Sequence, residues 1–164
     1  MRAHETAVRE LYEAEYGRLA GWSNKLVNDS ELAHDITTEC FVRLMARWTR
    51  VTQPRPWLYM TATNLIRDHW RKQQRERKAL VRLAEPPQTE PAPDPTIRDL
   101  VEQLPERMRT VVLLHYYADL PVHEIANVIG KAEGTVKRAL FDARQKLSEA
   151  LTADDVPHSQ EKTR

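Results

Sequence analysis

Basic side chains gather on one side of two short apolar segments in residues 123–147. The segments meet at a turn containing Gly130, and the apolar residues of the second segment are spaced by four, three and four positions. Such spacing is typical of one helical stripe, and two short helices joined at a glycine turn form a helix-turn-helix. The cations outside the stripe are Lys137, Arg138, Arg144 and Lys146. A cationic helix face favours binding to the major groove of DNA and its phosphates, with a plain helical hairpin as the alternative.

A second basic cluster lies earlier in the chain, around His69 and Trp70. Only Asp68 and Glu76 oppose its cations. These cations are Arg67, Arg71, Lys72, Arg75, Arg77, Lys78 and Arg82. Basic residues with interleaved aromatic rings suit phosphate contact combined with base stacking. A solvated helix end, where cations are also favoured, is the alternative, but the density of the cluster indicates nucleic acid.

Three helices are expected to position this cluster. Apolar periodicity predicts them over residues 5–27, over residues 31–48 and from residue 57 towards residue 82. Trp22 and Trp48 fall on inward faces, which predicts a small helical bundle.

Two short segments are expected to separate these helices. Residues 28–30 carry the small polar side chains that cap helix ends. Residues 49–56 contain Pro54 and Pro56, which are expected to keep this segment out of a helix because proline cannot sit in a helix interior.

A proline-rich stretch divides the chain. Residues 84–96 hold five prolines and three acids without apolar periodicity. This composition predicts an extended acidic linker, for which a tether is a sufficient role, although its acidity could also imitate nucleic acid in a basic channel. The fold class is therefore all-α, with two small helical domains joined by the linker.

Composition excludes several classes of protein. The 164 residues carry a net charge of +1 and one cysteine, Cys40, so no internal disulfide can form. No histidine has metal-ligand spacing, and we expect neither a metal site nor a cofactor. The amino-terminal segment is too charged for a signal peptide, and no apolar run approaches the ~18 residues of a membrane span. We therefore expect a cytoplasmic protein without membrane insertion.

Four stretches in order carry a family resemblance. Residues 33–41, AHDITTECF, resemble the acidic core-binding helix of bacterial sigma factors, and residues 56–71 resemble their promoter-melting helix through Trp57, Asn64 and Arg71. Residues 103–109 and 124–144 are similar to the opening and to the helix-turn-helix of the fourth sigma domain, through L-P…R and E-I-A…G…G-T-V-K…A-R.

The chain thus resembles sigma factors of the sigma-70 type, and more narrowly the extracytoplasmic-function (ECF) group, which keeps only the second and fourth domains. The resemblance implies sigma domain 2 at residues 5–82, a linker at 83–96, sigma domain 4 at 97–151 and a tail at 152–164.

The resemblance implies two kinds of partner surface on domain 2. The second helix is expected to dock on the clamp of the largest subunit of core RNA polymerase, while domain 4 meets the flap. The core-binding residues are expected to be Asp35, Glu39, Phe41 and Leu44. The residues expected at the −10 element are Arg47, Arg50, Arg55, Trp57, Asn64, Arg67, Arg71 and Lys72. Trp57 could stack on a base or be buried at the helix start.

Domain 4 is expected to hold the −35 element in the major groove. The implied residues are His115, Lys131, Thr135, Lys137, Arg138, Phe141 and Arg144. Arg144 binds phosphate or pairs within the domain. Four positions on this side depart from the family pattern: Ala132 lacks a capping oxygen, Arg138 and Asp142 replace Ser and Arg, and His115 replaces Arg. In the core-binding helix, His34 replaces Glu.

The expected function is promoter-specific initiation of transcription, in which the chain recognises the −35 and −10 elements and aids melting. Its partners are core RNA polymerase, promoter DNA and, as in many members of the group, an anti-sigma factor. A helix-turn-helix regulator acting without polymerase is the alternative. An enzyme is not favoured, because the sequence has no nucleophile constellation, phosphate loop or metal spacing.

Overall fold

The computed structural model describes residues 2–80 and 96–153, and all regular elements within these two ranges are helical. In chain order these are α1 (Arg2–Val27), α2 (Ser30–Arg47), the 3-10 turn η1 (Trp48–Arg50), α3 (Pro54–Leu80), α4 (Ile97–Gln103), α5 (Glu106–Val112), the π-helical turn η2 (Leu113–Tyr117), α6 (Val122–Ile129) and α7 (Glu133–Ala153). The all-α prediction is confirmed. The expected linker falls outside the described residues except for Thr96, as do residues 154–164 of the expected tail.

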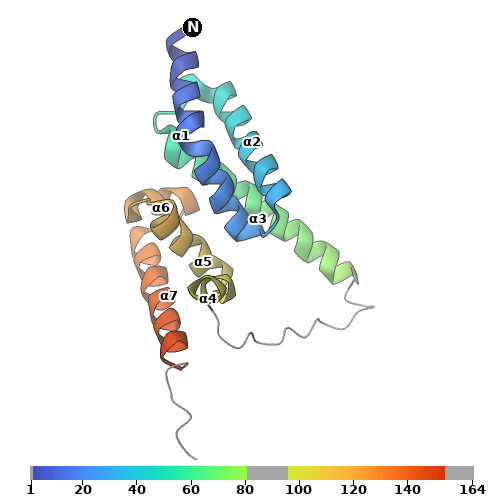
Figure 1. Cartoon of the computed structure of the whole chain (residues 1–164), viewed down its shortest axis with the longest axis vertical. Coiled ribbons are helices and arrows are strands. Elements are labelled where there is room, and N and C mark those ends of the chain that lie inside the picture. The colour runs from blue at the N-terminus through green and yellow to red at the C-terminus, as the bar shows by residue number, and fades with distance from the viewer. Residues whose placement is uncertain (1, 81–95, 154–164) are drawn as a thin grey trace, which may run out of the picture.

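The first three helices form the N-terminal unit, residues 2–80. Figure 1 shows α1 and α2 side by side, with α3 crossing behind them. The turn between α1 and α2 contains Asn28 in a left-handed conformation (φ 51°), and the Asp29 side chain accepts a hydrogen bond of 3.1 Å from the Leu32 amide. This N-cap satisfies one of the amides that a helix start leaves without a partner, as the sequence predicted.

The third helix begins earlier than the sequence predicted. Pro54 and Pro56 were expected to keep residues 49–56 out of a helix, yet both lie in the first turn of α3. Proline is tolerated there because the first amides of a helix have no intrahelical acceptor, and its fixed φ suits the helix.

The remaining helices form the C-terminal unit, residues 96–153. Thr96 and Asp99 begin α4 with a capping box in which each side chain bonds the other residue's amide. Hydrogen bonds from the Thr96 hydroxyl and amide hold the pKa of Asp99 below its usual value. Beyond α5 the helix widens into the π-turn η2, and Asp119 follows with a positive φ of 58°.

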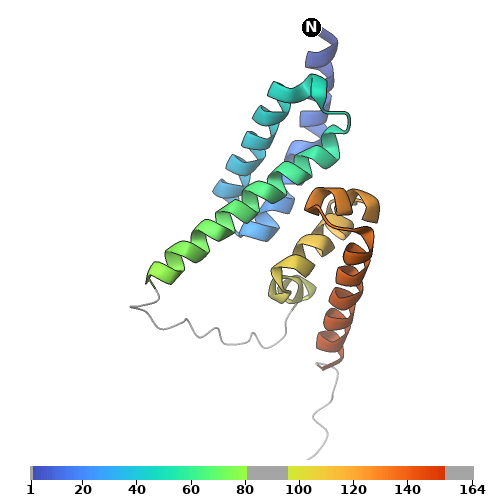
Figure 2. The same cartoon turned by 180° about the vertical axis from the view of Figure 1, so that it is seen from behind.

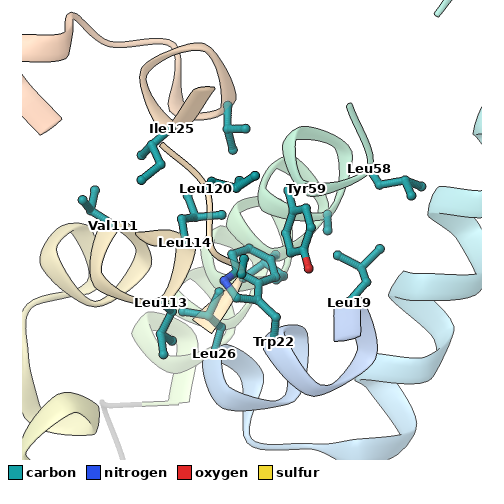
Figure 3. Close-up of a cluster of buried hydrophobic side chains, with 14 of the residues drawn as sticks. Leu19, Trp22, Leu26, Leu58, Tyr59, Val111, Leu113, Leu114, Leu120 and Ile125 are labelled. Atoms are coloured by element: carbon teal, nitrogen blue, oxygen red, sulfur yellow. The ribbon is translucent and has the colours of Figure 1, made fainter. Parts of the chain in front are cut away.

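One apolar core runs through both units. Trp22 of α1 and Tyr59 of α3 meet edge to face at 5.3 Å, and both are fully buried. Figure 3 shows this pair beside Leu114 and Leu120 of the C-terminal unit. In Figure 2, α6 lies directly against α3. The two units are therefore packed together through apolar side chains.

Cys40 has the packing role that its apolar surroundings indicated. The thiol is fully buried, and burial raises its pKa to about 12. A thiol in this state is chemically inert, because the thiolate is the reactive form. None of the described helices combines the length and apolar character that crossing a membrane requires.

Candidate polymerase and nucleic-acid interfaces

The acidic residues predicted to bind polymerase lie on the outer face of α2. Asp35 is exposed, and the Glu39 side chain, one turn later, is 46% exposed. Arg43 donates from Nε to Glu39 Oε1 at 2.6 Å, and this exposed i,i+4 pair offsets part of the Glu39 charge. Asp35 has no such partner within the described residues, so the face keeps a net negative charge that can meet a basic surface.

The apolar residues predicted beside these acids are covered by the bundle. Phe41 is 4% exposed and Leu44 is fully buried, so both side chains belong to the core of the N-terminal unit. Burial leaves Leu44 no surface for the partner in this conformation, whereas Phe41 also lines a groove on this side and its contact with the partner stays a prediction. They carry the apolar stripe that attaches α2 to the bundle, and Phe41 meets the Tyr12 ring edge to face at 5.1 Å.

A different set of apolar residues is exposed on this side. Tyr12, Val42 and Met45 are 46%, 54% and 62% exposed, and they line a groove of about 610 Å³ between α1 and α2. Val42 and Met45 fall outside the inward stripe of α2, so periodicity gave them no role. Exposed apolar side chains grouped in this way are typical of a protein-binding surface.

His34, one of the departures from the family pattern, is held by α1. Its ring stacks on Tyr16 at 5.8 Å, and the Tyr16 hydroxyl lies 3.1 Å from His34 Nδ1 and 3.2 Å from Thr38 Oγ1. The imidazole thus helps to join α1 and α2, in addition to its place beside the acidic face.

The residues predicted to capture the −10 element surround a depression at the start of α3. Arg47 and Arg50 are exposed, and Trp57 is half-buried; all three line a cavity of about 320 Å³. The Trp57 ring packs on the core and also contributes to the cavity wall, so its stacking on a base stays a prediction. Two residues of α6, Asn127 and Val128, also line this cavity.

Arg55 does not face this depression as a free cation. Its Nε donates to Glu15 Oε1 at 3.1 Å, and its terminal nitrogen donates to the Ala118 carbonyl. The guanidinium also lies 5.6 Å from the centre of the Tyr59 ring. The prediction that Arg55 binds DNA is therefore wrong for the protein in this conformation, because its donors are taken by α1 and by the C-terminal unit.

The other predicted −10 residues form a stripe along α3. Asn64 and Arg71 are exposed and lie seven residues apart, with the half-buried Arg67 between them on the same side. Lys72 is exposed next to this stripe. Arg71 makes one exposed ion pair with Asp68 at 3.3 Å, a contact that phosphate can displace at little cost.

Trp70 was considered a stacking group, but it is covered. Its ring is half-buried, and the Arg109 guanidinium of α5 lies 5.7 Å from the ring centre. The ring therefore serves the contact between the two units in this conformation.

The helix-turn-helix forms as the sequence predicted. Gly130 ends α6 in the left-handed region (φ 65°, ψ 38°), and the Lys131 amide donates back to the Ala126 carbonyl at 3.0 Å. Glycine is favoured here because a Cβ in this backbone conformation approaches the following carbonyl. Ala132 accepts the Thr135 amide at 3.0 Å through its carbonyl, so α7 starts without the side-chain cap that serine or threonine supplies.

We expect Gly130→Ala to lower the free energy of unfolding by about 1 kcal/mol, since alanine is strained at a positive φ. A thermal melt followed by circular dichroism measures this change. Gly134→Ala is the matched control, because Gly134 lies inside α7 with open space around its Cα, where alanine favours the helix. Equal losses for the two variants would contradict the role given to Gly130.

The face of α7 opposite its buried stripe carries the predicted DNA-reading residues. Val136, Leu140 and Ala143 are buried, as the periodicity predicted. Lys137 and Arg138 are exposed beside Phe141, which is 59% exposed. Phe141 has no core to cover at that position, and its ring suits contact with a thymine methyl group.

The unusual pair Arg138 and Asp142 is coupled. Arg138 Nε lies 3.1 Å from Asp142 Oδ1, one helical turn away. The Arg138 side chain is 77% exposed and that of Asp142 is 33% exposed. The guanidinium therefore neutralises a carboxylate that would otherwise repel phosphate, and the carboxylate restricts where the guanidinium points.

Two predicted −35 residues also have partners inside the C-terminal unit. Arg144 donates from Nε to the Tyr116 hydroxyl at 2.6 Å, which is the pairing that the sequence analysis left as its alternative to phosphate. His115 Nδ1 lies 3.1 Å from the Leu120 carbonyl and so supports the turn after η2. Lys131 and Thr135 stand at the start of α7, where helix amides attract phosphate.

Comparisons with known families match both units. A family model described as "Sigma-70 region 2" matches residues 11–76, and one described as "Sigma-70, region 4" matches residues 96–147.

Among curated proteins, the ECF RNA polymerase sigma factor SigM of Bacillus subtilis is 25% identical over 150 residues, covering 85% of this chain and 92% of its own length. The RNA polymerase sigma-E factor of Streptomyces coelicolor is 28% identical over 141 residues, covering 82% of this chain and 80% of its own length.

Solved structures share the fold. The sigma factor RpoE of Bartonella quintana, in complex with the anti-sigma factor NepR, aligns with a TM-score of 0.72 at 19% identity, covering 89% of this chain and 97% of that one. CnrH, in complex with the cytosolic domain of CnrY, aligns with a TM-score of 0.68 at 23% identity, covering 92% of this chain and 90% of that one.

Proposed function

The chain belongs to the extracytoplasmic-function group of sigma-70 RNA polymerase sigma factors, and on this premise we propose how its surfaces divide the work of initiation. The N-terminal unit, as sigma domain 2, binds core polymerase through α2 and captures the −10 element. The C-terminal unit, as sigma domain 4, holds the −35 element through α7. The observation that carries this division is the separation of charge, with an acidic face on α2 and cationic faces on α3 and α7.

Core polymerase binding is assigned to the outer face of α2. Asp35 and Glu39 attract a basic helical surface on the clamp, and Val42 and Met45 add the apolar contact first expected of Phe41 and Leu44. Arg43 supports this face by holding Glu39 in place.

Strand capture is assigned to the depression around Trp57 and to the stripe on α3. Extruding a base from the duplex costs a few kcal/mol, which stacking and phosphate contacts must offset. Trp57 supplies an aromatic wall, Asn64 supplies an amide that can bond a base edge, and Arg67 and Arg71 hold the backbone.

Duplex recognition is assigned to the exposed face of α7. Lys137, Arg138 and Phe141 face the base edges, while Lys131 and Thr135 meet phosphates at the helix start. Arg144 and His115 position this helix and its turn through Tyr116 and Leu120.

The chain supplies no catalytic group in this scheme. Nucleotide addition belongs to the core enzyme, and the chain acts in the cytoplasm, where the core enzyme and the promoter are found. An anti-sigma factor is the further partner that we infer, supported by the solved sigma factor RpoE of the same fold, which is bound to the anti-sigma factor NepR.

Run-off transcription tests the proposal. The full chain is added to bacterial core RNA polymerase with sheared genomic DNA of the source organism, and the transcripts are mapped. We expect discrete start sites that are absent without the chain, and co-elution of the chain with core enzyme on gel filtration. DNA binding without co-elution or start sites would instead support the helix-turn-helix regulator.

A further inference from the structure

Arg138 and Asp142 lie one turn apart on α7 and form an ion pair that solvent can reach. Arg138 Nε donates to Asp142 Oδ2 at 3.2 Å and lies 3.1 Å from Oδ1, so it faces both carboxylate oxygens. Figure 2 shows α7 along the outer edge of the C-terminal unit, with α5 beside it. Both residues depart from the family pattern, so whatever the pair recognises is a property of this chain.

Each member of the pair keeps hydrogen-bonding capacity. The contact engages Nε of the guanidinium, and the terminal nitrogens of Arg138 keep N–H donors in a planar fork. A carboxylate oxygen accepts more than one hydrogen bond, so Asp142 also keeps free lone pairs. The pair therefore presents a fork of donors and an acceptor side by side.

A G·C base pair presents the complementary pattern in the major groove. Guanine offers two neighbouring acceptors, N7 and O6, and cytosine offers one donor, its N4 amino group. O6 and N4 are hydrogen-bonded to each other at roughly 2.9 Å, which is close to the 3.1 Å that separates Arg138 Nε from Asp142 Oδ1. An A·T pair does not fit, because the adenine amino group lies between two acceptors that repel a carboxylate.

Phosphate is a poor partner for the pair. A cation that binds phosphate through Arg138 would bring the Asp142 carboxylate with it, and like charges placed together are costly. Arg107 of α5 is exposed and lines the same groove of about 470 Å³ as Arg138 and Asp142. It supplies a separate cation for the phosphates of the neighbouring strand, which leaves the pair available for a base edge.

We propose that Arg138 and Asp142 together read one G·C base pair of the −35 element. Arg138 donates to guanine N7 and O6, and Asp142 accepts from the cytosine amino group. The inference rests on the proposed function, because it names the sequence that α7 recognises there. Asp142 is then a specificity-determining residue, whereas a carboxylate that only balances the charge of Arg138 would leave base preference unchanged.

A base-pair scan with the holoenzyme tests the proposal. The full chain, bound to core polymerase, is titrated onto a promoter mapped by run-off transcription, with each base pair of its −35 element replaced in turn. We expect one G·C pair whose replacement weakens binding about 5- to 150-fold. Asp142→Ala and Arg138→Ala should each reduce that penalty, and the two reductions should sum to more than the reduction in the double variant. If Asp142→Ala tightens binding to every duplex equally and keeps all base preferences, the carboxylate only balances charge and the proposal is wrong.

A modified duplex tests the carboxylate contact directly. N4-methylcytosine keeps its Watson–Crick hydrogen bond, but a methyl group replaces the amino hydrogen that faces the major groove. Placed at the identified G·C pair, it is expected to weaken binding of the unchanged chain about fivefold or more and to leave binding of Asp142→Ala as it was. An equal effect on both chains would show that Asp142 does not accept from this amino group.

Glu102→Ala is the matched control. It removes the acid of another exposed i,i+4 pair, in which Arg98 Nε lies 3.3 Å from Glu102 Oε1 on α4, and should leave every base preference unchanged. A loss of preference equal to that of Asp142→Ala would contradict the assignment, and circular dichroism confirms that each variant is folded. A holoenzyme that binds no promoter would count against the proposed function. One that initiates transcription but shows no G·C preference sensitive to Asp142 would overturn this inference alone.

Discussion

Reversing both charges in Asp35→Arg/Glu39→Arg is expected to weaken binding to core RNA polymerase by about 100-fold. Two attractions become repulsions, and like charges placed against each other in an interface cost several kcal/mol. Glu39 also loses its pair with Arg43, although such an exposed pair contributes only about 0.3–0.5 kcal/mol. Stability is therefore expected to change little while affinity falls, which separates binding from folding.

The measurement is a titration of labelled chain with core enzyme at low and at high salt. The defect should shrink at high salt, because exposed charges are screened. Glu102→Arg/Glu106→Arg is the matched control: these exposed acids are also four residues apart, and Glu102 pairs with Arg98 as Glu39 pairs with Arg43. Unchanged affinity for the α2 variant, or an equal defect in the control, would remove the two acids from the interface.

The second large effect is expected from Lys137→Ala on the recognition helix. A cation at a base edge contributes about 1–3 kcal/mol, so affinity for a duplex carrying the −35 element should fall about tenfold or more. Lys146→Ala removes the same charge nine residues later on the same helix, which is two and a half turns away and on the opposite side. Its loss is expected to be much smaller.

Salt dependence distinguishes the kind of contact that Lys137 makes. If Lys137 binds only phosphate, affinity falls equally for all duplexes and the salt slope decreases by about 1. If it reads a base, the loss is concentrated on the mapped −35 sequence. Equal affinities of Lys137→Ala and Lys146→Ala for that sequence would contradict the orientation assigned to α7.

Several elements could be predicted closely because their signals are local. The Asp29 cap, the turn at Gly130 and the buried stripe of α7 each depend on residues within a few positions of one another, and the structure confirms all three. The early start of α3 was missed for an equally local reason. Proline is excluded from a helix interior but accepted in a first turn, and periodicity alone does not locate that turn.

On the candidate surfaces, the exposure of charged residues was predicted better than that of apolar residues. Charged positions such as Asp35 and Lys137 are exposed as expected, because a charge without a buried partner stays in water. Phe41 and Leu44 were expected at the polymerase interface, yet the bundle covers both, since a family motif marks a helix without saying which of its apolar residues are buried. The exposure of Val42 and Met45 could be recognised only from the way α1 and α3 pack against α2.

The sequence by itself determined the helices, their order, the helix-turn-helix and the distribution of charge, because each follows from spacing within one helix or one turn. Only the tertiary structure decided which residues far apart in the sequence contact one another. Arg55 contacts both Glu15 and Ala118, and Gly21 lies against Tyr117, although these residues are far apart in the sequence. Such pairings depend on how helices pack, and periodicity carries no information about the partner. For that reason the sequence predicted Arg55 as a DNA contact, whereas in the folded chain its guanidinium donates to the Glu15 carboxylate and to the Ala118 carbonyl.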